Sequence, residues 1–297
     1  MAESKSGELN APTCIADVKA VLGEGPVWVE REGALYWVDI KGYKVFRYTV
    51  EGGALKTWKT PYRICSLAPR AAGGFVAGTE HGFFRIDLEE DRFMPIVDPE
   101  PDRMTNRFND GKLDRSGRFW AGTMDNDEKE ASGALYRLDP GNKWARVDDG
   151  YRVTNGPAFS PDGRLMYHND SARQLTYVFD LDEAGGARNR RTFLQFGQGD
   201  GYPDGMTVDA EGCLWIAFWD GWCVRRFSPE GERLAELKVP AQRPTSCAFG
   251  GAGLDQLFVT SASIGLSDDE LKSQPQAGGL FLVQPGVAGL ADVPFPG

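Results

Sequence analysis

The sequence contains an internal repeat. Three stretches begin with a polar residue, reach a turn glycine eight positions later and reach a bulky apolar residue eleven positions later. They start at Asn109, Asn155 and Asp204. Each glycine ends a short polar turn between two apolar runs, which is the pattern of a β-hairpin. A chain with this repeat is expected to be built from copies of one small β unit.

Weaker copies of the pattern extend the repeat to six units. They begin at Glu24, Cys65 and Ser246, and the first positions of successive units lie 41 to 49 residues apart. A unit of this length holds about four short strands. The apolar runs are rich in β-branched and aromatic residues and are broken by Gly, Asp and Pro, which leaves little room for helices. The sequence therefore predicts an all-β fold, a six-bladed β-propeller.

The repeat also predicts the domain organisation. We expect residues 1–13 to form a flexible N-terminal tail and residues 14–297 to form a single propeller domain. Residues 14–20 are available to complete the last blade, because closing the ring removes an exposed strand edge. One helix is expected at residues 267–272, where Ser267 and Glu270 have the spacing of a capping box.

Charge and composition argue against several classes of partner. A formal net charge of −10 is unfavourable for binding nucleic acid or an anionic membrane surface. The longest apolar run, residues 214–219, is far shorter than the roughly 18 residues of a membrane span. The N-terminus lacks an apolar signal segment, and the five cysteines form no C-x-x-C pair. We therefore expect a cytoplasmic protein with reduced thiols, and a monomer, since a closed ring needs no partner.

The first positions of the repeat indicate a metal site. A propeller places equivalent positions of its blades around one axis, so these residues should meet at one mouth of the central channel. Four of them, Glu24, Asn109, Asn155 and Asp204, carry oxygen donors. Two buried carboxylates repel each other unless a cation neutralises them, and such oxygens suit Ca²⁺, Mg²⁺ or Mn²⁺, with Zn²⁺ at lower specificity. The alternative is that each Asp-Gly or Asn-Gly pair is an ordinary turn.

Other catalytic patterns are absent or incomplete. Only two histidines occur, His81 and His168, which excludes a three-histidine zinc site. There is no G-x-S-x-G nucleophile motif and no glycine-rich phosphate-binding motif. The sequence therefore gives no indication of a nucleotide cofactor.

Several segments resemble the regucalcin/gluconolactonase family over about residues 14 to 285. They are residues 22–28, 106–112, 121–124, 155–156, 203–206, 245–251 and 274–279. The resemblance implies a six-bladed propeller that hydrolyses sugar lactones with a divalent cation at the channel mouth. It also implies that Glu24, Asn155 and Asp204 bind the metal and that Arg107 and Asn109 contact the substrate.

One position departs from the family pattern. The family has an acidic substrate contact shortly after the Gly-Thr-Met segment, and here several acidic residues follow that segment. Spacing favours Asp127 as this contact, with Glu128 as the alternative. The sugar preference is therefore left open.

The resulting hypothesis is hydrolysis of an aldonolactone, such as glucono-, xylono- or arabinonolactone, to the aldonic acid. One divalent cation (Ca²⁺, Mn²⁺, Mg²⁺ or Zn²⁺) would polarise the carbonyl, and Asp204 would act as general base. One alternative is a metal-dependent aryl esterase or phosphotriesterase on the same scaffold, against which the polar Arg107 and Asp127 argue. The other is a non-catalytic calcium-binding or protein-interaction propeller, which has no need for a ring of acid and amide side chains.

Overall fold

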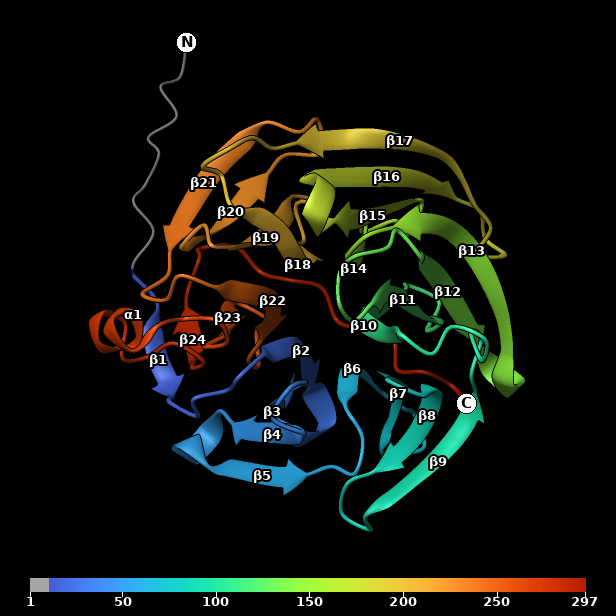
Figure 1. Ribbon diagram of the computed structural model, residues 1–297, viewed down its shortest axis with the longest axis horizontal. Helices are drawn as coiled ribbons and strands as arrows, with labels where there is room; N and C mark the ends of the chain where they lie inside the picture. The colour runs from blue at the N-terminus through green and yellow to red at the C-terminus, as the bar shows by residue number, and fades with distance from the viewer. Residues whose placement is uncertain (1–10) are drawn as a thin grey trace.

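The computed structural model describes residues 11–297, so most of the expected tail at residues 1–13 lies outside the described residues. The strands form six four-stranded sheets, which are arranged as blades around a central axis (Figure 1). The predicted all-β six-bladed propeller is confirmed.

Within each blade the strands are antiparallel and run from the axis outward (Figure 1). The innermost strands are β2 (Gly23–Val29), β6 (Ile64–Pro69), β10 (Asn106–Leu113), β14 (Thr154–Phe159), β18 (Tyr202–Val208) and β22 (Pro244–Gly250). The second strands are β3 (Ala34–Asp39), β7 (Phe75–Thr79), β11 (Phe119–Asp125), β15 (Leu165–Asp170), β19 (Leu214–Trp219) and β23 (Gln256–Ser261). The third strands are β4 (Lys44–Thr49), β8 (Gly82–Asp87), β12 (Gly133–Asp139), β16 (Leu175–Leu181), β20 (Cys223–Phe227) and β24 (Leu280–Val283). The outermost strands are β5 (Leu55–Lys59), β9 (Arg92–Val97), β13 (Lys143–Tyr151), β17 (Ala187–Gln195), β21 (Arg233–Lys238) and β1 (Thr13–Ala16).

Helical segments are short. The α-helix is α1 (Asp268–Ser273), and the 3₁₀ segments are η1 (Glu30–Glu32), η2 (Glu51–Gly53), η3 (Pro140–Asn142) and η4 (Ser171–Arg173). The predicted capping box is present at α1, because the Ser267 hydroxyl accepts a hydrogen bond from the Glu270 N–H and the Glu270 side chain accepts one from the Ser267 N–H. Within the described part of the chain, no helix has the length and apolarity needed to cross a membrane.

The two ends of the chain complete the ring and cover the channel. Strand β1 pairs with β24, as predicted, so the last blade contains strands from both ends of the sequence. After β24 the chain crosses to the second blade, where Phe295 pairs in parallel with Arg70. On the way, Leu290 and Asp292 line a cavity of about 40 Å³ with the later residues of the innermost strands. The C-terminal segment therefore covers one end of the channel, where the innermost strands of the blades end.

Buried aspartates fix the spacing between the repeat turns and the aromatic residues that follow them. The carboxylate of Asp209 accepts hydrogen bonds from two backbone N–H groups of its own turn and from Nε1 of Trp215 at 2.8 Å. Asp114 makes the same set of contacts, with Trp120 Nε1 at 2.8 Å. One carboxylate thus holds both the turn and the indole ring that packs in the blade.

Replacing Asp209 with alanine is expected to lower the free energy of unfolding by about 3 kcal/mol. The substitution leaves the indole N–H of Trp215 without its acceptor and removes the buried one of the two carboxylates that pair with Arg226. Urea unfolding followed by tryptophan fluorescence measures this change. The control is Glu211→Ala, which removes the exposed second partner of Arg226 and should cost less than about 1 kcal/mol. Equal losses in the two variants would contradict this role for Asp209.

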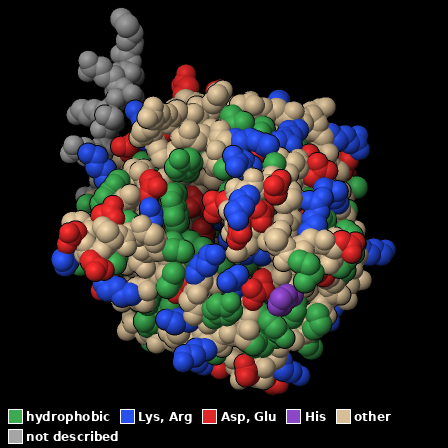
Figure 2. All heavy atoms as spheres, in the orientation of Figure 1, with side chains coloured by type: hydrophobic (Ala, Val, Ile, Leu, Met, Phe, Trp, Pro, Cys, Tyr) green, Lys and Arg blue, Asp and Glu red, His purple; other side chains and the backbone are tan. Residues whose placement is uncertain are grey.

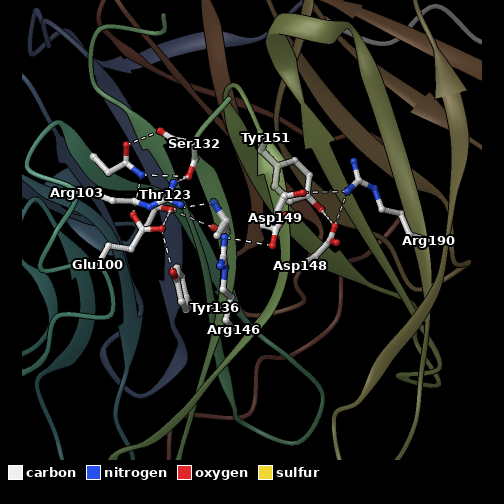
Figure 3. A network of polar contacts seen from close by, with 12 residues as sticks. Glu100, Arg103, Thr123, Ser132, Tyr136, Arg146, Asp148, Asp149, Tyr151 and Arg190 are labelled. Carbon is white, nitrogen blue, oxygen red and sulfur yellow. Dashed lines mark hydrogen bonds and ion pairs between the residues drawn. The ribbon is translucent and has the colours of Figure 1, made fainter. Parts of the chain in front are cut away.

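A polar network holds the connection between β9 and β10 against the third blade (Figure 3). Glu100 accepts hydrogen bonds from Thr123 Oγ1 at 3.0 Å, Tyr136 OH at 2.9 Å and Asn106 Nδ2 at 2.8 Å. Asn106 is the first residue of β10. The network therefore fixes the start of the strand that carries two of the predicted site residues.

Candidate functional site

The polar first positions lie where the innermost strands are irregular. The pairing between the first and second strand shifts register directly after Glu24, after Phe108, after Asn155 and after Pro203. Such β-bulges bend a strand and redirect its side chains. Asn155 and Asp204 lie inside β14 and β18, so the alternative that they belong to ordinary turns is wrong.

The glycines after these residues serve the bulges and the close approach of blades. Gly156 has a φ of 86°, which glycine adopts readily and other residues adopt rarely. At Gly205 the reason is different, because an added Cβ would lie 2.1 Å from Ser246 Oγ in the next blade. The Asn-Gly and Asp-Gly pairs are thus part of the strand geometry that aims the site residues.

A cavity of about 540 Å³ opens at this mouth of the channel. Its lining includes Glu24, Arg107, Asn109, Asn155 and Asp204. Figure 2 shows a hollow near the centre of this face with acidic atoms in its wall. The structure thus brings five of the six predicted site residues to one cavity.

Hydrogen bonds link several of these side chains across two blades. Arg107 Nη1 donates to Asn109 Oδ1 at 2.7 Å, and Asn109 Nδ2 donates to Asn155 Oδ1 at 3.0 Å. Asn155 Nδ2 donates to Ser171 Oγ of η4 at 2.8 Å. This chain orients the Asn155 amide, and its oxygen retains a second lone pair for another partner.

The two carboxylates are buried and poorly satisfied. Glu24 and Asp204 are 5% and 6% exposed. Glu24 accepts a hydrogen bond from the Gly25 N–H at 2.9 Å. Oδ1 of Asp204 is buried and has no hydrogen-bond partner among residues 11–297. A buried carboxylate oxygen without a partner is costly, which points to a ligand at this position.

A third buried carboxylate strengthens this charge conflict. Burial and the neighbouring Asp110 raise the pKa of Glu24 to about 8. Burial and the Glu24 carboxylate raise the pKa of Asp204 well above its usual range. Asp110 itself accepts hydrogen bonds from the N–H groups of Gly111 and Gly156, both at 2.8 Å. The repeat does not indicate Asp110, because only the preceding asparagine stands at the repeat position.

The donor set fits a hard divalent cation. Carboxylate oxygens of Glu24 and Asp204 and the amide oxygen of Asn155 are of the type that Ca²⁺, Mg²⁺ and Mn²⁺ prefer. No group of three His, Cys, Asp or Glu side chains suited to a metal occurs in the part of the chain that the structure describes. A cation here would therefore need an amide oxygen as a ligand, and it would supply the partner that Asp204 Oδ1 lacks.

The sixth predicted residue lies elsewhere. Asp127 is exposed, forms an ion pair with Lys129 at 3.0 Å and borders a second cavity of about 390 Å³. Glu128, the alternative, lines the main cavity and has a left-handed backbone with a φ of 59°. The structure therefore places Glu128, and not Asp127, at the main cavity, and the identity of the acidic substrate contact stays a prediction. No sequence signal marks this turn, because non-glycine residues rarely take a positive φ.

Further lining residues come from outside the repeated positions. They are Leu22, Lys41, Met124, Arg152, Val153, Ser171, Ala172, Tyr202, Trp219, Arg243, Ile264 and Gly265. The repeat specifies only the bulge positions, so it gives no information on these residues. Neither histidine lines the main cavity. His168 is buried, which lowers its pKa to about 3, and His81 borders the second cavity.

Comparisons with known proteins agree with the fold and with the family resemblance seen in the sequence. Residues 22–263 match the family model described as the SMP-30/Gluconolactonase/LRE-like region. A regucalcin of Danio rerio is 39% identical over 289 residues, which cover 96% of this chain and 98% of that protein. An L-arabinolactonase of Azospirillum brasilense is 38% identical over 289 residues, covering 96% and 95%. The solved structure of a calcium-binding regucalcin from Agrobacterium tumefaciens has a TM-score of 0.92 at 26% identity, covering 97% of this chain and 98% of the other.

Proposed function

The chain belongs to the SMP-30/gluconolactonase/LRE-like family, and from this premise we propose that it hydrolyses a sugar lactone to the open aldonic acid. Relatives named as sugar lactonases, such as the L-arabinolactonase, support this activity. The observation that carries the proposal is the pair of buried carboxylates, Glu24 and Asp204, on a cavity of about 540 Å³. A cavity of this volume suits a monosaccharide.

Glu24, Asn155 and Asp204 are the residues proposed to hold one divalent cation, which is Ca²⁺, Mn²⁺, Mg²⁺ or Zn²⁺. The unpartnered Asp204 Oδ1 supports this assignment, as does the solved regucalcin described as a calcium-binding protein. When bound, the cation supplies Lewis-acid polarisation of the lactone carbonyl.

Asp204 is the proposed general base. It takes a proton from the water that attacks the carbonyl carbon, and that proton is returned to the ring oxygen when its bond to the carbonyl carbon breaks. The product is an open chain with a carboxylic acid and a free hydroxyl group. Burial of Asp204 keeps bulk water from competing for its carboxylate.

Arg107, Asn109 and Glu128 are proposed to bind the sugar. The Arg107 side chain is held by hydrogen bonds from Nη1 to Asn109 Oδ1 and to the Phe108 carbonyl at 2.9 Å. Its Nη2 group makes no hydrogen bond to any described residue, so it can donate to a substrate oxygen. Glu128 takes the place of Asp127 as the acceptor of hydrogen bonds from sugar hydroxyls.

Acid release from gluconolactone, xylonolactone and arabinonolactone, measured on chelated protein with each divalent cation restored in turn, tests the proposal. Cation-dependent hydrolysis of at least one lactone is expected. Cation binding without acid release from any lactone would favour the alternative of a non-catalytic calcium-binding propeller.

Glu128→Gln is expected to raise KM for the lactone about tenfold, since a hydrogen bond from a sugar hydroxyl to a charged group is worth about 1.5 kcal/mol. Asp127→Asn is the matched control and should change KM less than twofold, because Asp127 lies outside the main cavity. Steady-state kinetics on the best lactone measure both. A larger increase in KM for Asp127→Asn than for Glu128→Gln would favour Asp127 as the acidic substrate contact.

A further inference from the structure

Three cationic side chains converge beside the candidate site. Lys41 Nζ, Arg63 Nη1 and Arg107 Nε lie 3.3, 3.5 and 3.2 Å from one atom, the Oδ1 oxygen of Asn126. Lys41 follows β3, Arg63 precedes β6 and Arg107 belongs to β10, so three successive blades contribute one cation each. These residues are far apart in the sequence, and the packing of the three blades brings their charges together.

The charge of this cluster is incompletely compensated. An amide oxygen accepts hydrogen bonds but carries no net charge. Arg63 pairs with Glu80 at 3.4 Å, whereas Lys41 and Arg107 make no ion pair within 4.0 Å in residues 11–297. Burial and the guanidinium groups of Arg107 and Arg63 lower the pKa of Lys41, while Glu128 favours its charged form. Adjacent cations without acidic partners form a site where an anion is stabilised.

The cluster lies at the wall between the two cavities. Lys41 lines the main cavity, Arg63 and Asn126 line the second cavity, and Arg107 lines both. A group attached to a sugar that contacts Arg107 can therefore reach the other two cations. The cluster is thus placed to contact a substituent of the substrate as well as a free ion.

The remaining charges of the main cavity also favour an anion. A divalent cation would neutralise Glu24 and Asp204, and the buried Asp110 contributes one further negative charge beside them. Among the other charged lining residues, Arg243 pairs with Asp220 at 2.7 Å, which leaves Lys41, Arg107 and Arg152 against Glu128. This local excess of positive charge occurs in a chain whose formal net charge is −10. Neutral sugar hydroxyls would not compensate it.

We infer that Lys41, Arg63 and Arg107 bind an anionic group on the lactone itself, so that the substrate is a sugar lactone with a carboxylate, phosphate or sulfonate on its exocyclic carbon. This inference rests on the proposed lactonase function. Guanidinium groups bind such anions through paired hydrogen bonds, and the lysine adds a mobile point charge. Family membership does not specify which sugar lactone is the substrate, and this inference narrows the class to lactones with an anionic group.

Kinetics on metal-loaded protein test the inference. The probes are D-glucono-1,5-lactone and its analogues with a carboxylate, a phosphate or a sulfonate at carbon six. At low ionic strength kcat/KM for the best anionic lactone should exceed that for gluconolactone about tenfold or more, and added salt should reduce this ratio. Comparing the three analogues identifies the anion.

Lys41→Met keeps the aliphatic stem and removes the charge, and it should lower the ratio about tenfold. Lys59→Met is the matched control, because Lys59 is exposed on β5 of the same blade and lines neither cavity. A ratio at or below one for all three anions, or the same ratio in Lys41→Met and wild type, would overturn the inference.

A binding measurement separates this inference from the proposed function. Calorimetry should show that D-glucarate, a dicarboxylate, binds more tightly than D-gluconate, and that Lys41→Met and Arg63→Met reduce the difference. If no lactone is hydrolysed but glucarate is still preferred, the lactonase proposal fails and the anion site stands. If lactones are hydrolysed without any preference for anions in kinetics or binding, the anion site fails and the lactonase proposal stands.

Discussion

Replacing Asp204 with asparagine is expected to lower kcat for lactone hydrolysis by at least about a thousandfold. The substitution keeps the size of the side chain but removes the proposed general base, a loss that typically costs a factor of about 100 to 10,000. It also removes one of the two negative charges proposed to hold the cation. Steady-state acid release at saturating cation measures the effect, and elemental analysis of the purified variant reports whether the cation is retained.

Asp162→Asn is the matched control, because Asp162 is an exposed turn residue that does not line the main cavity. It should keep kcat within about twofold. A kcat for Asp204→Asn within tenfold of wild type at saturating cation would show that Asp204 is not the base. Recovery only at high cation concentration would assign it a ligand role alone.

The same substitution is expected to stabilise the chelated protein at pH 8. Asp204 is buried beside Glu24, which raises its pKa, and Oδ1 has no partner in the described residues. A neutral amide removes the repulsion between the two carboxylates and the cost of burying one charge. A protein that becomes more stable when a functional residue is replaced retains that residue because of selection for function. Thermal unfolding of the two chelated proteins measures the difference.

The positions of the ring residues could be predicted from the sequence because propeller symmetry determines them. A repeat of 41 to 49 residues places Glu24, Asn109, Asn155 and Asp204 at equivalent points of their innermost strands. A glycine directly follows Glu24, Asn155 and Asp204, and a bulge occurs at each of these three points. The closure of the ring by β1 was predictable for a similar reason, since an open ring would expose a strand edge.

The residues proposed to contact the substrate could not be predicted in the same way. Whether Asp127 or Glu128 faces the cavity depends on a left-handed φ at Glu128, which neighbouring residues do not encode in any recognisable pattern. Lys41 and Arg63 lie outside the repeated positions, and their proximity to Asn126 depends on how three blades pack. The sequence thus predicts the residues at positions that the blades share. The residues proposed to set specificity lie at positions where the blades differ.

Asp110 illustrates a second limit of sequence reasoning. It stands next to a repeat position, but its carboxylate accepts the Gly156 N–H of the next blade at 2.8 Å. It therefore contributes both to packing between blades and to the negative potential around Glu24. Only the structure shows that a third carboxylate shares the buried charge of the proposed metal site.

Removing the cation is expected to abolish hydrolysis, with a loss of at least about a thousandfold, and to make stability fall as pH rises. Burial and Asp110 raise the pKa of Glu24 from 4.5 to about 8 in the folded, metal-free chain. Between pH 4.5 and about pH 8, Glu24 of the folded chain holds a proton that Glu24 of the unfolded chain has released. The folded state therefore binds more protons, and the free energy of unfolding decreases with increasing pH. The expected loss between pH 5 and pH 8 is on the order of 3 kcal/mol.

Saturating cation should remove the part of the pH dependence of stability that comes from Glu24. The cation competes with protons for the same carboxylates, so its affinity rises with pH and its binding releases protons. The stabilisation by a fixed excess of cation should therefore be larger at pH 8 than at pH 5. Thermal unfolding at several pH values, with chelator and with cation, measures both trends.

Glu24→Gln is the control that isolates this carboxylate. The amide cannot ionise, so the chelated variant should lose most of the fall in stability between pH 5 and pH 8, while its hydrolytic activity stays low at every cation concentration. Identical pH profiles of unfolding for the chelated and the cation-loaded wild type would contradict the model. They would mean that Glu24 and Asp204 share no ion, and the proposed role of the cation in hydrolysis would fail with that result.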